Sequence, residues 1–284
     1  MSGSYCRFLV LLATLALIAA ATARAQQNEP AQAPAEQEQS PPQMPMPQLP
    51  VVLLPDKPVL EPKALEILKA ASERLVSAQT MTFTAIATYE SPAETLQPLA
   101  YTTLSEVTLQ RPDKLRVITP GDGPPTEFYY DGKTIMAYSP DSNMVAIDDA
   151  PPTVDEMLKY AYNKAAIYFP FDDILATDPY KGLGELKLAF VIGQSHVVGG
   201  VLTDMVAIVN DFAQAEVWIG VEDHLPRRVR VTYFNEPGNF RHDVEFSNWQ
   251  LNPVLPPGTF ASERAAKATR IKFESPDEKL PQPQ

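Results

Sequence analysis

Most of the chain alternates between apolar and polar residues with a period of two, which predicts β-strands. The clearest example runs from Met81 to Tyr89, where every second residue is apolar or aromatic. Similar strand patterns cover residues 101–109, 115–119, 189–192, 206–209, 215–221, 228–234 and 242–249. Residues 61–79 differ, because their apolar residues recur at helical spacing and predict an amphipathic helix near the start of this region.

A β-hairpin is predicted where Asp131-Gly132 separates two apolar segments. This dipeptide tolerates the positive φ angles that a two-residue type I′ turn requires. With such a turn, Tyr130 would face Lys133 on the opposite strand. One side of the hairpin would then be largely apolar.

The strands are interrupted by a second predicted helix. Thr153 can cap it, and Glu156 three residues later completes a capping box. Eight or more strands with an N-terminal helix and a helical insertion predict the α+β class. We expect a strongly curved antiparallel sheet with helices packed on one side.

The first 25 residues predict a cleaved secretory signal peptide. An apolar run covers residues 8–21, and residues 23–25 have the small-x-small pattern of a cleavage site. The run is shorter than the roughly 20 residues that a membrane-spanning helix needs, although a retained signal anchor is the alternative. Cys6 precedes the run, so acylation of the lipoprotein type is not expected. We therefore expect a periplasmic protein that is not an integral membrane protein after cleavage.

Composition adds a proline excess, with 29 Pro in 284 residues. Nine of them fall within residues 26–58. A Pro-, Gln- and Glu-rich segment cannot bury enough apolar area to offset its ordering entropy, so residues 26–60 predict a disordered linker. The alternative is a recognition arm, in which residues 51–54 could fold back over the protein's own pocket. A disordered tail is predicted for 275–284, which leaves 61–274 as one folded domain.

Charge and motifs exclude several classes of protein. A net charge of −12 disfavours nucleic-acid binding and adhesion to anionic lipid surfaces. The single Cys excludes an intrachain disulfide, and no metal, cofactor or catalytic motif is present. The paired acids Asp172-Asp173 predict a helix cap or a solvated turn. We expect no enzyme, no cofactor and no metal.

Two polar clusters remain as weaker candidates. Asp223 and His224 could form a titrating pair, although a hairpin loop explains them equally well. Arg228 and Arg230 share one strand face and could bind an anion through two parallel hydrogen bonds. Pairing with Glu216 on the neighbouring strand, or simple solvation, is the alternative that we favour for these arginines.

A series of short motifs resembles a family of predicted periplasmic proteins of unknown function. In order, the motifs are Asp178-Pro179-Tyr180, Val191-Ile192-Gly193, Val198-Gly199-Gly200, Val217-Trp218-Ile219, Leu225-Pro226-Arg227-Arg228-Val229, Val231-Thr232-Tyr233 and Phe246-Ser247-Asn248-Trp249. The family is similar to the LolA/LolB lipoprotein-localisation superfamily, which also includes LppX and RseB. Met205 departs from the pattern, since a His is expected there.

The resemblance implies a LolA-like half-barrel of about eleven antiparallel strands, with helices covering a concave apolar cavity. In LolA and LppX such a cavity receives acyl chains. By alternation, the residues that we assign to the cavity side are Phe83, Leu115, Val117, Phe128, Tyr130 and Ile135. Ordinary core packing beneath a helix is the alternative for each of them.

Three functions therefore compete. The leading hypothesis is a non-enzymatic binder or carrier of a lipid or lipidated ligand. The second is a regulatory or scaffolding envelope protein that recognises a protein partner, as the resemblance to RseB implies. The third is a hydrolase, for which Asp223-His224 is the only motivation.

Overall fold

A computed structural model describes residues 55, 57–92, 97–121, 123–234 and 238–274. The predicted signal peptide, nearly all of the predicted linker and the predicted tail lie outside these residues. Those three assignments therefore stay predictions.

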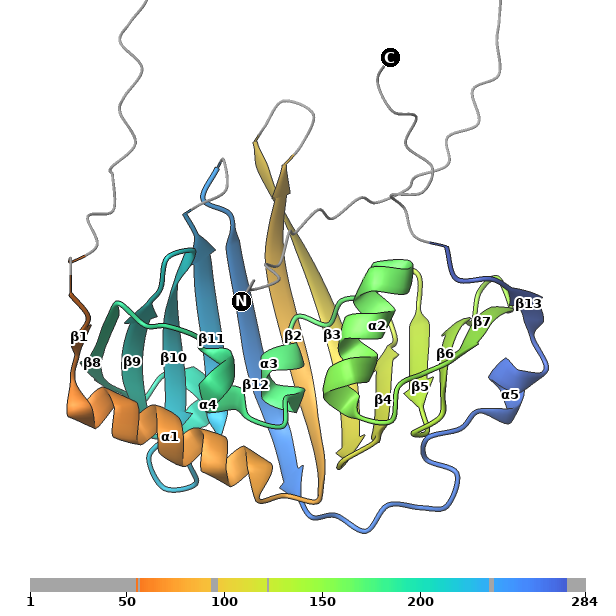
Figure 1. Ribbon diagram of the computed structural model, residues 1–284, viewed down its shortest axis with the longest axis horizontal. Coiled ribbons are helices and arrows are strands. Elements are labelled where there is room, and N and C mark those ends of the chain that lie inside the picture. The colour runs from red at the N-terminus through yellow and green to blue at the C-terminus, as the bar shows by residue number, and fades with distance from the viewer. Residues whose placement is uncertain (1–54, 56, 93–96, 122, 235–237, 275–284) are drawn as a thin grey trace, which may run out of the picture. The chain divides into compact units, whose positions relative to one another are not determined.

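The described residues form one thirteen-stranded sheet with five α-helices and one short 3₁₀ helix (Figure 1). The strands are β1 (Val59–Leu60), β2 (Thr80–Pro92), β3 (Pro98–Gln110), β4 (Lys114–Thr119), β5 (Thr126–Tyr130), β6 (Thr134–Ser139), β7 (Met144–Asp149), β8 (Leu188–Ser195), β9 (Thr203–Val209), β10 (Ala213–Gly220), β11 (Pro226–Tyr233), β12 (Arg241–Leu251) and β13 (Thr269–Ile271). The helices are α1 (Pro62–Val76), α2 (Val154–Ala165), α3 (Asp172–Leu175), α4 (Pro179–Gly182), α5 (Glu263–Ala266) and the 3₁₀ helix η1 (Val198–Gly200).

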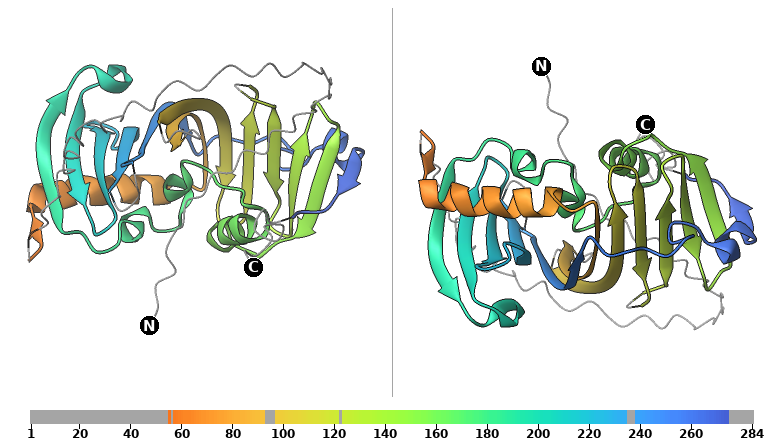
Figure 2. Two further views of the ribbon diagram at one scale, coloured as in Figure 1. Left: turned by 90° about the horizontal axis from the view of Figure 1, so that it is seen from above. Right: turned by 90° about the horizontal axis from the view of Figure 1, so that it is seen from below.

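The sheet is curved and unclosed, with the strand order β1-β8-β9-β10-β11-β12-β2-β3-β4-β5-β6-β7-β13 (Figures 1 and 2). Strands β2 to β12 pair antiparallel, which confirms the predicted architecture of about eleven such strands. The two edge strands β1 and β13 pair parallel with their neighbours and were not predicted. Each has only two or three residues, too few to show a period. The sheet thus includes the last two residues of the predicted linker, Val59 and Leu60.

Helix α1 forms because its apolar residues recur at helical spacing and Pro62 occupies the first turn, where it costs no intrahelical hydrogen bond. Its N-cap residue is Glu61, and the helix ends at Val76, three residues before the predicted end at residue 79. The buried stripe includes Ala64, Ile67 and Leu68, which contact inner residues of β8 to β10. Helix α1 therefore covers one half of the inner face of the sheet.

Helix α2 begins as predicted at Thr153, whose side-chain oxygen accepts a hydrogen bond from the Glu156 amide at 3.3 Å. It ends at Ala166, which has a left-handed φ of 51°. Residues 150–176, which contain α2 and α3, are called the cover segment below. The buried residues of this segment join the same core cluster as β2 to β6, so the segment covers the other half of the inner face (Figure 2).

The β5–β6 hairpin is present, but its predicted register was wrong. Tyr130 pairs with Ile135 rather than with Lys133. The reason is the Asp131 side chain, whose Oδ1 accepts hydrogen bonds from the amides of Lys133 at 2.9 Å and Thr134 at 2.8 Å. These bonds stabilise a longer loop than a two-residue type I′ turn. The apolar side of the hairpin still faces inward.

The outer face of β5 to β7 is covered by α5. Tyr138 and Val145 point to this face and contact Ala265. Glu127 is buried, receives a hydrogen bond from Tyr129 at 2.8 Å and forms an ion pair with Arg264. The segment that follows β12 is therefore fixed to the back of the sheet, opposite the cover segment.

Candidate functional site

The six residues predicted to face a cavity all lie together in the main apolar cluster, on the inner face of the sheet. They are Phe83, Leu115, Val117, Phe128, Tyr130 and Ile135. The cross-strand pairs Val117–Phe128 and Tyr130–Ile135 place these side chains on one surface. Each of the six is 5% exposed or less. The alternation of the sequence thus identified one continuous surface, and the structure shows it beneath the cover segment.

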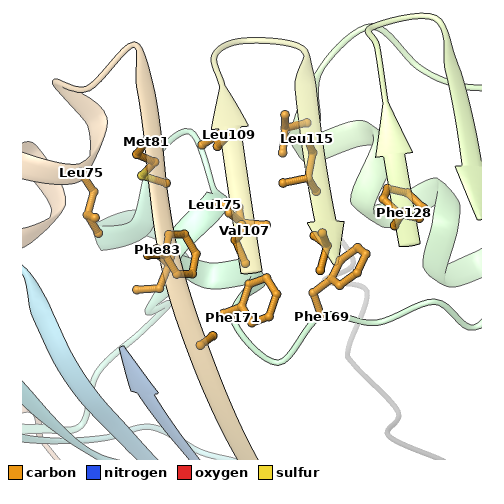
Figure 3. Packing of buried hydrophobic residues seen from close by; sticks show 14 of the residues in the cluster. Leu75, Met81, Phe83, Val107, Leu109, Leu115, Phe128, Phe169, Phe171 and Leu175 are labelled. Carbon is orange, nitrogen blue, oxygen red and sulfur yellow. The ribbon is translucent and has the colours of Figure 1, made fainter. Parts of the chain in front are cut away.

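Two phenylalanines of the cover segment make aromatic contacts with this surface. The rings of Phe169 and Phe128 lie 5.1 Å apart in an edge-to-face arrangement. The rings of Phe171 and Phe83 lie 5.7 Å apart, again edge to face. Figure 3 shows these side chains pointing toward one another from the cover segment and the strands. Sequence analysis did not single them out for this role, although Phe169-Pro170-Phe171 is an unusually aromatic stretch for a connection between elements.

The start of the cover segment is held by polar contacts. The Tyr130 hydroxyl donates a hydrogen bond to the Pro151 carbonyl at 2.5 Å, and the Val154 amide donates to the Pro112 carbonyl at 3.0 Å. Burial, followed by the charge of Asp113, raises the pKa of Tyr130 to about 12. The hydroxyl therefore remains a hydrogen-bond donor at neutral pH. Residues 169 and 171, farther along, contact the sheet through apolar side chains.

Asp172 and Asp173 are the first two residues of the short helix α3, whose N-cap residue is Phe171. Burial, followed by the charge of Asp173, raises the pKa of Asp172 to about 7. Burial also raises the pKa of Asp173. These acids lie next to the buried apolar residues Phe171 and Ile174 in the cover segment. Asp172 therefore takes up a proton near neutral pH, at a higher pH than an ordinary carboxyl group.

Three of the motifs that carry the family resemblance meet at one end of the sheet, around Arg227. A depression of about 310 Å³ is lined by Gly199, Asp223, Leu225, Arg227, Phe246, Ser247, Asn248 and Trp249. A second depression of about 330 Å³ shares Asp223 and Arg227. Arg227 donates to Asp223 at 2.5 Å and to the Leu225 carbonyl at 3.0 Å. Its side chain is only 11% exposed, so this ion pair fixes the junction of the three motifs.

This packing predicts that substitution of two adjacent glycines by alanine destabilises the protein to different extents. Gly199 and Gly200 both have left-handed backbones, with φ of 70° and 68°. A Cβ atom on Gly199 would lie 2.6 Å from Cδ of Arg227, whereas one on Gly200 would meet nothing within 4 Å. We expect Gly200→Ala to cost about 1 kcal/mol for the backbone alone. Gly199→Ala should cost about 1–3 kcal/mol more because of overpacking. Urea unfolding of both variants measures the difference, and equal costs would contradict the contact.

The two candidate anion-binding arginines lie on the outer face of the sheet, opposite the apolar cluster. Arg228 donates to both carboxylate oxygens of Asp243, from Nε to Oδ1 at 2.8 Å and from Nη2 to Oδ2 at 2.5 Å. Its guanidinium also stacks over the ring of Trp218, 5.3 Å from the ring centre. Arg228 is thus already paired, with Asp243 rather than Glu216 as its main partner. Arg230 lies on the same face, across from Asp243 and Glu216 in register.

The histidines do not come together. His224 is exposed in a turn with φ of 55°, and its neighbour Asp223 pairs with Arg227 instead. His242 is buried on the inner face, 6.5 Å from the ring of Tyr168. In the described residues, no group of three or more His, Cys, Asp or Glu is placed to hold a metal ion. This geometry gives the hydrolase hypothesis no acid–histidine pair at residues 223 and 224.

The chain belongs to the family described as "Predicted periplasmic protein (DUF2092)", whose model matches residues 64–274. This match confirms the family expected from the motifs. No curated protein matches the sequence significantly. Helices in the described ranges are too short or too polar to cross a membrane.

Several solved structures are similar to this chain at low sequence identity. LprF from Mycobacterium bovis is 16% identical, with a TM-score of 0.42, and the match covers 69% of this chain and 97% of LprF. A LolA superfamily protein from Nitrosomonas europaea is 8% identical, with a TM-score of 0.34, over 70% of this chain and 98% of that one. The Pseudomonas aeruginosa MucA/MucB complex is 13% identical, with a TM-score of 0.43, over 74% of this chain and 64% of that one.

Proposed function

We propose that this protein is an exported, non-enzymatic binder or carrier of a lipid or lipidated molecule. The observation that carries the proposal is an apolar sheet face together with the kind of segment that covers it. One continuous apolar face of the curved sheet is covered by a connecting segment with two short helices, rather than by a second sheet or a helical bundle. An apolar partner that buries the same face could replace this covering, provided that its own burial offsets the contacts that are lost.

The energetics favour an alkyl chain as that partner. Uncovering the sheet would expose buried side chains that each contribute about 1.5–3 kcal/mol to stability. Each buried CH₂ group of a ligand contributes about 0.8 kcal/mol. A chain of about 14 methylene groups could therefore offset the loss of several side-chain contacts. The acyl chain would lie against Phe83, Val117 and Phe128, in the place that Phe169 and Phe171 occupy in the structure.

Export through a cleaved signal peptide is part of the same proposal. The family description and the predicted signal both point to the periplasm, where lipids and lipidated proteins must cross an aqueous space. N-terminal sequencing of the protein recovered from the producing cell tests cleavage after Ala25. A mature N-terminus at residue 1 would show that the signal is retained.

Ligand binding is tested by displacement of a fluorescent fatty acid from the purified protein, together with mass spectrometry of its organic extract. We expect saturable binding by the wild type. Phe169→Ala should increase the affinity several-fold, because the cover segment would compete less well for the inner face. Phe190→Ala on the outer face, where this ring is 44% exposed, is the matched control and should leave the affinity unchanged. An empty extract together with no saturable binding would overturn the proposal.

Recognition of a protein partner is the second candidate function. It is favoured by exposed apolar side chains along β8 and the following loop, where Phe190 is 44%, Ile192 45% and Val197 87% exposed. Cross-linking in cells that express the wild type or Ile192→Lys tests it. A partner lost on this substitution, with lipid binding intact, would favour a scaffolding role. Identical cross-links in both would count against this surface.

A further inference from the structure

Arg111 lies at the edge of the inner-face cluster, between the sheet and the cover segment. It directly follows β3, and its amide donates to the Gln79 carbonyl at 2.9 Å. Its Nη1 donates to the carbonyl of Leu175, the last residue of α3, at 3.2 Å. Leu175 and the nearby strand residue Leu109 are both fully buried in the cluster. The guanidinium is thus anchored where the apolar surface ends.

The rest of this guanidinium has no hydrogen-bond partner. Its Nε and Nη2 atoms are both buried and unpaired. A buried polar group without a partner costs free energy, and a charged one costs more. Asp155 is the acidic residue whose charge acts on Arg111, but its Oδ1 accepts a hydrogen bond from the Thr177 amide at 3.0 Å. No ion pair joins Arg111 to an acid within the described ranges of the chain.

Arg228, on the outer face, uses the corresponding two nitrogens to form an ion pair. In Arg228, Nε and Nη2 bind the two oxygens of Asp243 side by side. This arrangement is the one in which a guanidinium recognises a carboxylate or a phosphate. Arg111 therefore presents, beside an apolar surface, the same pair of donors that Arg228 uses for a carboxylate.

We propose that Nε and Nη2 of Arg111 bind the anionic head group of a lipid, a carboxylate or a phosphate, whose alkyl chain lies on the inner-face cluster. The proposal rests on the proposed function and specifies the class of lipid. Access to the two buried nitrogens requires the α3 end of the cover segment to move. An alkyl chain that displaces Phe171 and Leu175 from the sheet would cause that movement.

The test compares three probes that share one alkyl chain: oleate, oleoyl lysophosphatidate and uncharged methyl oleate. Each is titrated against the full mature chain in competition with a fluorescent fatty acid. We expect wild-type protein to bind at least one anionic probe at least 10-fold more tightly than methyl oleate. Tighter binding of oleate identifies a carboxylate ligand, and tighter binding of oleoyl lysophosphatidate identifies a phosphate ligand.

Three variants isolate the role of the two nitrogens. Arg111→Gln should weaken the binding of the preferred anionic probe about 10- to 100-fold, which is the usual contribution of a charged hydrogen bond. The affinity for methyl oleate should not change. Arg111→Lys keeps the charge but not the paired donors, so it should restore only part of the affinity. Arg230→Gln makes the same chemical change on the opposite face and should not change the affinity for either probe.

The possible failures are distinguishable. If no probe binds the wild type, the proposed function itself fails. If all three probes bind equally and Arg111→Gln changes none of them, the protein binds lipids but the assignment of Arg111 is wrong. Asp155→Asn gives a measurement that does not depend on the Arg111 variants folding. It removes the acidic charge that acts on Arg111 and should strengthen the binding of anionic probes several-fold, and an unchanged or weaker affinity would overturn the proposal.

Discussion

Replacing Phe171 with Ala should lower the free energy of unfolding by about 3–5 kcal/mol, the cost usually found for removing a fully buried aromatic side chain. Phe171 is 2% exposed, and its ring lies 5.7 Å from that of Phe83 and 5.8 Å from that of Phe169. The truncation leaves a cavity where the cover segment meets the sheet. Urea unfolding, monitored by intrinsic fluorescence, measures this loss of stability.

Phe190→Ala is the control for this prediction. Phe190 lies on the outer face of β8 and is 44% exposed, so its truncation should cost about 1 kcal/mol or less. If Phe171→Ala costs no more than Phe190→Ala, the cover segment does not contribute to the core. A loss of cooperativity in Phe171→Ala alone, with a smaller slope against urea, would show that the cover segment detaches separately.

Lowering the pH from about 6.5 to about 4 should remove about 3 kcal/mol of stability through His242 alone. Burial lowers the pKa of His242 from 6.5 to about 4, although Asp243 acts in the opposite direction. In that pH window the unfolded chain binds a proton at this residue and the folded chain does not. Stability from His242 is therefore complete above pH 6.5 and is lost as the pH falls to about 4.

Asp172 has the opposite effect over much of the same window. Its pKa is about 7 in the folded protein against 3.8 in the unfolded chain, so the folded state binds the extra proton and gains stability as the pH falls. The comparison is therefore made in an Asp172→Asn background, with and without His242→Phe. Chemical unfolding at several pH values should show a steep loss of stability in the single variant and a much flatter profile in the double variant. Parallel profiles would contradict the assignment to His242.

Local patterns predicted the parts of the fold that depend on neighbours in sequence. The alternation from Met81 to Tyr89 placed β2 correctly, and the Thr153–Glu156 pair marked the start of α2. The β5–β6 register was missed because the Asp131 side chain binds two backbone amides, a contact that the dipeptide alone does not reveal. The edge strands β1 and β13 were missed because their conformation comes from the neighbouring strand rather than from their own residues.

The candidate site, like the fold, was predicted from the sequence only in part. Alternation alone placed residues such as Phe83 and Phe128 on one apolar face, because successive side chains of a strand point to opposite sides. It could not show that Phe169 and Phe171 cover that face, since they are separated from it by a long stretch of chain. Nor could it show that Arg228 is paired with Asp243 while two nitrogens of Arg111 lack partners.

The sequence by itself determined an acidic chain with a predicted export signal, a family of predicted periplasmic proteins and a sheet with one apolar face. These features depend on composition and on periods of two or 3.6 residues, which are local. Only the tertiary structure decided what lies against the apolar face and which charged groups are paired. Those contacts join residues far apart in the chain, and their free energies arise from burial that exists only once the sheet has curved around its core.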